Sequence, residues 1–241
     1  MRMPLKISSH LVRASFLATI LVVMAHVDDE MNPTKRTWVE SFLGGEFSAA
    51  NVSNFFFISG YLIAHSFDDK KWWVCAIAKR VRSLLVPYVL WNIIYVSIYL
   101  IASPTFELPH RNVDEIWHSV IRIFGIGTTP APIDFPLWYL KNLFLFVLIS
   151  PLVKLTATRG LKVVLITLAI IYALQIFITL NFPCLISFSR YGFNLIGFGA
   201  FVVGAFLSVH PYAMPIWLSK TTVIPPLLTW IIMSVFCKLC H

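Results

Sequence analysis

Charged residues are scarce in this 241-residue chain, at 12% of the total, whereas soluble domains carry about 25%. Hydrophobic residues make up 58%, and the mean hydropathy is +0.79. This composition excludes an ordinary soluble domain. It predicts an integral membrane protein whose chain crosses the lipid bilayer several times.

Several patterns that would indicate other chemistry are also missing. The sequence has no glycine-rich phosphate loop, no metal-spaced cluster of His, Cys and Asp, and no internal repeat. The four cysteines do not predict disulfides, because Cys75 falls in a loop expected to be cytoplasmic. The net charge of +8 lies mostly in short loops, and no basic face alternates with aromatic residues. We therefore expect no metal, no bound cofactor and no nucleic-acid partner.

Seven apolar runs are long enough to cross the hydrocarbon layer, which needs about 20 helical residues. Lys and Arg alternate onto one side of these runs, which places the amino terminus in the cytoplasm. We predict an all-α fold, a polytopic transmembrane helical bundle that forms one domain over residues 1–241. The predicted spans are Leu11–Val27, Ala49–Phe67, Leu84–Ser103, Leu137–Lys154, Leu161–Leu180, Tyr191–Val209 and Thr222–Leu239.

A histidine stands at the outer end of the first span. His26 lies beside Asp28 and Asp29, and a nearby carboxylate favours the charged imidazole. Histidine can also act as a general base toward a hydroxyl group. A helix-end histidine that reaches water explains the same position, and both interpretations stay open.

Four basic residues lie where they could hold an anionic substrate. Arg13 is near the inner end of the first span, Arg80 and Arg82 follow the second, and Lys141 lies one turn inside the fourth. Guanidinium groups bind phosphate through charge-assisted hydrogen bonds. Lys141 could instead pair with Asp134. Topology alone explains the arginines equally well, and a side chain that reaches the membrane surface explains Lys141.

The second span carries the segment Ser59-Gly60-Tyr61. Small and hydroxyl-bearing residues let helices approach closely inside a bilayer. Ser59 lacks the strand-turn-helix context of a hydrolase nucleophile. We therefore predict helix packing for this segment, and a structural role for His65 at the inner end of the span.

The order of these motifs resembles membrane-bound acyltransferase family 3, the bacterial sugar O-acyltransferases. The matching segments are LVVMAH, FFFISGYLI, KRVRSLLVPYVLW and PLWYLKNLFLFVLISPL, between about Val12 and Leu152. The resemblance implies a multi-pass protein of the bacterial inner membrane. It also implies transfer of an acyl group, often acetyl, from cytoplasmic acyl-CoA to a hydroxyl of a surface glycan or lipid-linked sugar.

The resemblance also assigns roles to residues. His26 matches the essential histidine of the first span, and Trp138 matches a tryptophan of the fourth. The Ser-Gly-Tyr segment matches the family's second-span motif. Arg80 and Arg82 match the family's basic cytoplasmic loop. We therefore expect His26 to be catalytic, and substrates to contact Arg13, Ser59, Tyr61, Arg80, Arg82, Trp138 and Lys141.

The chain departs from the family pattern in two respects. The family commonly has an arginine eleven positions before the histidine, where this chain has Ser15. Arg13 is thirteen positions away, which on a helix is a rotation of roughly 220° from His26. The family also has more than seven spans, and we expect this chain to lack the last ones. Two alternative functions stay open: a non-catalytic relative, or a small-solute transporter, which would need broken helices or charges along a path.

Overall fold

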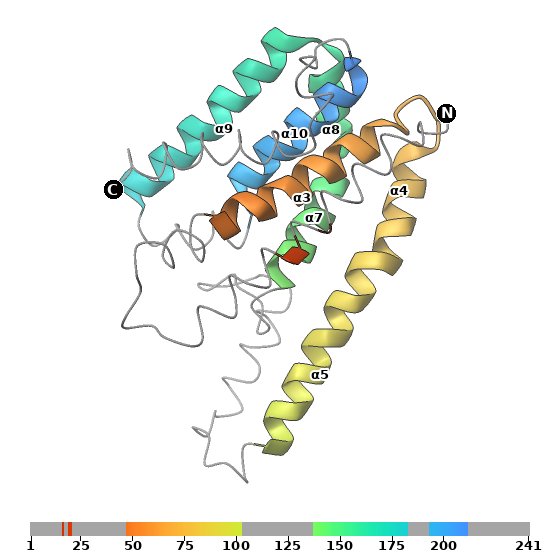
Figure 1. Cartoon of the computed structure of the whole chain (residues 1–241), viewed down its shortest axis with the longest axis vertical. Coiled ribbons are helices and arrows are strands. Elements are labelled where there is room, and N and C mark those ends of the chain that lie inside the picture. The colour runs from red at the N-terminus through yellow and green to blue at the C-terminus, as the bar shows by residue number, and fades with distance from the viewer. Residues whose placement is uncertain (1–15, 17–18, 21–46, 103–136, 183–192, 212–241) are drawn as a thin grey trace. The chain divides into compact units, whose positions relative to one another are not determined.

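The computed structural model describes residues 16, 19–20, 47–102, 137–182 and 193–211. Within these ranges the regular elements are helical and no strand occurs, in agreement with the all-α prediction. The predicted single domain over residues 1–241 stays a prediction. The elements are α3 (Phe47–Ala64), α4 (Trp72–Arg80), the π-helical turn η2 (Val81–Leu85), α5 (Val86–Ala102), α7 (Trp138–Leu148), α8 (Ser150–Thr158), α9 (Leu161–Asn181) and α10 (Leu195–Val209) (Figure 1).

The described helices belong to two compact units. Unit 1 holds α3, most of α8, the first half of α9, and α10. Unit 2 holds α4, η2, α5, α7, the second half of α9 and the residues just before α10. The helices within each unit are held together by a few specific contacts, which are described below for each unit in turn.

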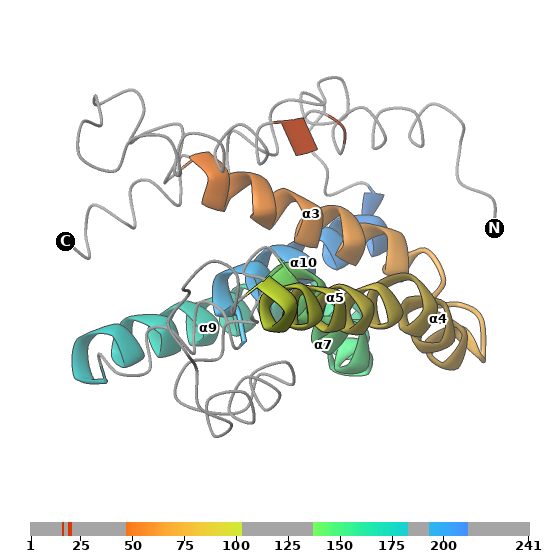
Figure 2. The same cartoon turned by 90° about the horizontal axis from the view of Figure 1, so that it is seen from below.

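In unit 1, α3 and α10 pack with their backbones in contact, as Figure 2 illustrates for the two neighbouring helices. A Cβ atom added at Gly204 of α10 would lie 2.0 Å from the carbonyl oxygen of Phe57 in α3. Gly60 of α3 stands equally close to the backbone of α10. Glycines at a crossing allow this approach because they have no side chain. The prediction that the Ser-Gly-Tyr segment packs helices together is confirmed.

Two basic side chains in unit 1 bind carbonyl groups at helix C-termini. Lys154 of α8 donates a hydrogen bond to the carbonyl of Phe67, in the turn after α3, and lies 5.7 Å from the centroid of its ring. The Nε2 atom of His210, just after α10, is 3.0 Å from the carbonyl oxygen of Ala157 in α8. C-terminal carbonyls carry partial negative charge, which such donors stabilise. These contacts join the ends of α3, α8 and α10 that are predicted to be cytoplasmic.

In unit 2, α4, η2 and α5 form one uninterrupted helix over residues 72–102, and α7 packs against α4 and η2. Leu137, at the start of α7, packs with Tyr88 of α5 in a buried cluster. At the other end of α7, the carbonyl of Leu148 accepts a 3.2 Å hydrogen bond from Nε1 of Trp73. The two helices therefore run antiparallel.

The fourth predicted span, Leu137–Lys154, is not one continuous helix. Helix α7 ends at Leu148 and α8 begins at Ser150. Pro151 has no N–H group to donate to the carbonyl of Val147, four residues back. The Oγ atom of Ser150 donates to that carbonyl instead, at 2.6 Å. The segment predicted as the fourth span is therefore bent by 61° at this break.

By length and composition, α9 is the one described helix able to cross a membrane by itself, and the bent pair of α7 and α8 qualifies when counted together. Large apolar side chains are exposed along α9, including Leu165, Ile170 and Phe177. Such a surface suits contact with lipid better than contact with water. The arrangement of seven spans stays a prediction.

Candidate functional site

One face of the long helix in unit 2 is covered at every fourth residue. Leu84, Tyr88 and Asn92 are buried, and Arg80 is half-buried. Four residues exceed one α-helical turn by about 40°, so this spacing drifts around a plain α-helix. The wider turn of η2 offsets part of the drift. These four residues, here called the buried stripe, therefore occupy one side of the helix.

Two arginines that are close together in the sequence differ in their exposure. Arg80 ends α4 and is half-buried, whereas Arg82 lies in η2 and is exposed. The resemblance matches both to a basic loop between two spans, and in the structure residues 72–85 of this connection are helical. Helix phase therefore distinguishes them: Arg80 adjoins Leu84 on the stripe, and Arg82 faces outward.

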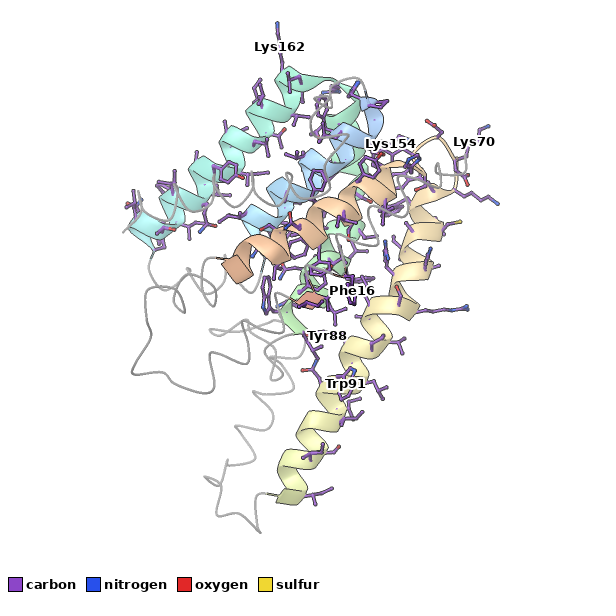
Figure 3. All side chains as sticks on the ribbon, viewed as in Figure 1. Phe16, Lys70, Tyr88, Trp91, Lys154 and Lys162 are labelled. Atoms are coloured by element: carbon purple, nitrogen blue, oxygen red, sulfur yellow. The ribbon has the colours of Figure 1, made fainter. Side chains whose placement is uncertain are left out.

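The centre of the stripe is the contact between α5 and the start of α7. Tyr88 is 4% exposed and packs with Leu137, with Val89 and Leu140 against the same cluster. Trp91, three residues after Tyr88, is 54% exposed (Figure 3). The stripe therefore meets α7 at Tyr88, while the other side of α5 carries exposed apolar side chains.

The two predicted substrate residues of α7 are both half-buried. The carbonyl of Trp138 accepts a 3.0 Å hydrogen bond from Nδ2 of Asn142. Lys141 lies one turn after Leu137, and its predicted partner Asp134 lies outside the described residues. Because α7 packs against α4 and η2, the structure brings Trp138 and Lys141 into the same helix pair as Arg80.

A buried amide ties α7 to the segment before α10. Asn142 is fully buried, and its Oδ1 atom accepts a 2.8 Å hydrogen bond from the backbone N–H of Asn194. Phe146, one turn further along α7, meets Phe193 edge to face with ring centroids 5.4 Å apart. Both hydrogen-bonding ends of the Asn142 amide are thus used within unit 2.

Asn92 makes the same local bond but uses only one end of its amide. Its Nδ2 atom donates to the carbonyl of Tyr88 at 2.7 Å, and the side chain is 0% exposed. No donor within the described part of the chain reaches its Oδ1 atom. A buried oxygen without a hydrogen bond costs about 1–3 kcal/mol. The stripe therefore ends in an acceptor that the described residues leave unused.

The Ser-Gly-Tyr segment belongs to unit 1 and has a packing role there. Tyr61 is buried and meets the ring of His65 at 5.8 Å in an edge-to-face contact. Ser59 is half-buried in the same helix. The expected structural role of His65 is consistent with this contact, while the predicted substrate contacts of Ser59 and Tyr61 stay predictions.

The predicted catalytic residue cannot be placed beside the stripe. His26 and Arg13 both lie outside the described residues, so their roles stay predictions. In the described ranges, no three His, Cys, Asp or Glu side chains gather as a metal ion would require.

Two buried asparagines were not identified as candidates from the sequence. An ionisable residue at membrane depth indicates a functional site by its charge, whereas Asn92 and Asn142 are neutral. Their position inside apolar runs was nevertheless a usable signal, because an amide in a membrane helix needs hydrogen-bonding partners.

Comparison with known proteins adds an independent finding. The model of acyltransferase family 3, described as an acyltransferase domain, matches residues 15–240. The chain is also similar to the succinoglycan biosynthesis protein ExoH of Rhizobium meliloti (strain 1021), with 28% identity over 138 residues. This alignment covers 54% of the chain and 36% of ExoH, so the chain spans little more than a third of that relative. No solved structure matches the chain significantly.

Proposed function

The chain belongs to acyltransferase family 3, and from that premise we propose that it transfers an acyl group from cytoplasmic acyl-CoA to a sugar hydroxyl. We propose acetyl as the acyl group, and a cell-surface glycan or its lipid-linked precursor as the acceptor. The family match over residues 15–240 is the observation that carries this proposal. The name of the relative places that protein in succinoglycan biosynthesis, which supports a sugar acceptor.

The proposed reaction is a direct transfer between two bound substrates. His26 takes the proton of the sugar hydroxyl, and the oxygen attacks the thioester carbonyl of acyl-CoA. The carbon–sulfur bond breaks, the new ester forms, and the CoA thiolate leaves and takes up a proton. Holding both substrates in one site lowers the entropic barrier to their meeting.

The anionic end of acyl-CoA would be held by arginine. Arg80 is the better placed of the two predicted residues, because it is half-buried at one end of the stripe. A guanidinium group offers paired N–H donors that match phosphate oxygens. This arrangement supports a donor site on the side of the membrane predicted to be cytoplasmic.

A multi-pass protein of the bacterial inner membrane fits this reaction. The exposed apolar surface of α9 supports a lipid environment for the chain. In such a membrane the donor comes from the cytoplasm and the glycan acceptor lies on the outer side. We propose this location as part of the function.

Mass spectrometry of surface polysaccharide tests the proposal in cells. Cells that produce the chain are expected to carry base-labile acyl esters that are absent without it. The His26→Ala variant should lose these esters at equal abundance in the membrane, and Lys162→Met should keep them. Equal esters with and without the chain, across several polysaccharides, would favour a non-catalytic relative.

A further inference from the structure

The long helix of unit 2, which runs from α4 through η2 into α5 (Figure 1), has an exposed face opposite the buried stripe. Val86 and Leu90 lie two residues before and after Tyr88, which is a rotation of about 200° from it on an α-helix. Both side chains are just over half exposed. This surface, here called the outward face, continues at intervals of three or four residues through Arg82, Val86, Leu90, Ile93 and Ser97, all of them exposed.

Positive charge gathers at one end of the outward face. Lys79 and Arg82 are both exposed, and their spacing of three residues makes them neighbours on a helix surface. Ser83, also exposed, lies one turn after Lys79 and adds a hydroxyl donor. The sequence has no Asp or Glu between residues 70 and 106. The two cations therefore have no carboxylate on their own helix to neutralise them.

We propose that the outward face binds one anionic phospholipid, with its phosphate at Lys79 and Arg82 and its acyl chains along Val86, Leu90 and Ile93. This inference rests on the proposed membrane location and not on the proposed reaction. It adds a lipid partner to the function.

The dimensions of the outward face match a lipid of one leaflet. The hydrocarbon layer of a bilayer is about 30 Å thick, so one leaflet contributes roughly 15 Å. Arg82 and Ile93 are eleven residues apart, which corresponds to roughly 16 Å of helix. Charged side chains give way to apolar ones between Arg82 and Val86, within a single turn. A phosphate at the level of the cations would therefore have its acyl chains beside apolar side chains.

The charge of the outward face favours an anionic lipid over a zwitterionic one. The headgroup of phosphatidylcholine carries a cation of its own, which Lys79 and Arg82 would repel. Phosphatidylglycerol has the same phosphate and a neutral, hydroxyl-bearing headgroup. Basic residues just outside a membrane span attract anionic lipids, and each such residue adds to the attraction. Because both cations are exposed, a lipid reaches them from the bilayer without any cavity.

Native mass spectrometry of the purified full chain measures this preference. The protein is equilibrated in micelles that hold equal amounts of phosphatidylglycerol and phosphatidylcholine, and the lipids that remain bound are counted. The unmodified protein should retain phosphatidylglycerol about tenfold more than phosphatidylcholine. The double variant Lys79→Gln/Arg82→Gln should retain the two lipids equally. Lys79→Gln alone should lose about half of the preference on a logarithmic scale, and it provides the test if the double variant does not fold.

A second double variant separates this site from a general effect of charge. Basic residues on the cytoplasmic side also orient a membrane protein. Arg159 and Lys162 are exposed and are predicted to lie on that side. Arg159→Gln/Lys162→Gln therefore removes the same charge from the same side of the membrane, but away from the outward face. It should keep the tenfold preference.

Competition with CoA distinguishes a lipid site from a site for a soluble phosphate compound. CoA carries phosphates but no pair of acyl chains, so it should leave the bound phosphatidylglycerol in place.

The proposal is overturned by equal retention of the two lipids in the unmodified protein, by equal loss of preference in both double variants, or by displacement of the lipid by CoA. A lipid preference that persists in a protein without acyl transfer would contradict the proposed function alone. Acyl transfer by a protein without the preference would contradict this inference alone.

Discussion

Gly60 of α3 lies directly against the backbone of Phe201 in α10: a Cβ atom at Gly60 would fall 2.0 Å from the Phe201 carbonyl oxygen. The contact is reciprocal, because Gly204, one turn after Phe201, stands equally close to Phe57. Two helices that are far apart in the sequence are thus joined through two glycines. This close packing explains why the Ser-Gly-Tyr motif has a glycine at position 60.

Alanine at Gly60 is expected to destabilise the protein strongly. The added methyl group would meet backbone atoms, which cannot turn aside as a side chain can, so the helices must separate. We expect a loss of about 3 kcal/mol in the free energy of unfolding. Thermal unfolding in detergent measures it, with Leu62→Ala on the exposed side of α3 as the control. Equal melting temperatures for the two variants would contradict the close contact.

Two lysines in unit 1 should differ in their effect on stability (Figure 3). Lys154 binds the Phe67 carbonyl and lies over its ring, whereas Lys162 is exposed at the start of α9. Lys154→Met should lose about 1–2 kcal/mol, because the C-terminal carbonyl loses a charged donor. Lys162→Met should lose nothing. Similar unfolding curves for both variants would show that Lys154 serves only to orient the chain in the membrane.

Removal of the Asn142 amide should destabilise unit 2. In Asn142→Leu the N–H of Asn194 loses its acceptor in a partly buried position, at an expected cost of about 1–3 kcal/mol. Asn181→Leu is the matched control: Asn181 makes the same Nδ2 bond to the carbonyl four residues back, but it is exposed. Chemical unfolding, monitored by tryptophan fluorescence, measures the free energy of unfolding of the two variants. A loss no larger than that of the control would mean that the Asn194 contact contributes little.

Arg80 and Arg82 should differ in how much they contribute to binding of the acyl donor. Arg80→Gln is expected to raise the KM for acyl-CoA about tenfold, because a half-buried charged hydrogen bond is lost. Arg82→Gln should have a much smaller effect, since Arg82 is exposed and its attraction is screened by salt. Initial rates at varied acyl-CoA concentration provide the comparison. The reverse order of effects would contradict the proposed role of Arg80 in donor binding.

The features that were predictable from the sequence depend on local pattern. Apolar runs in the sequence predict helices α3, α9 and α10, and the observed bounds of these helices lie close to the predicted ones. The packing role of Gly60 follows from residue size. The break before Pro151 could have been foreseen, because proline cannot donate the hydrogen bond that continues a helix.

Other features depend on geometry that no local pattern contains. The difference between Arg80 and Arg82 arises from helix phase across η2, and a π-helical turn has no distinctive residues to mark it. The hydrogen bonds that the side chains of Asn92 and Asn142 make depend on which segments pack against each helix. The relation of His26 to these residues stays a prediction, because His26 lies outside the described ranges.

Transfer of radiolabelled acetyl from acetyl-CoA to glycan, in membranes that contain the chain, tests the central claim most directly. Label in base-labile esters on glycan, absent with His26→Ala and retained with Lys162→Met, is the predicted result. Folded protein that transfers no label to any of several glycans, or transfers it equally with His26→Ala, would contradict the account.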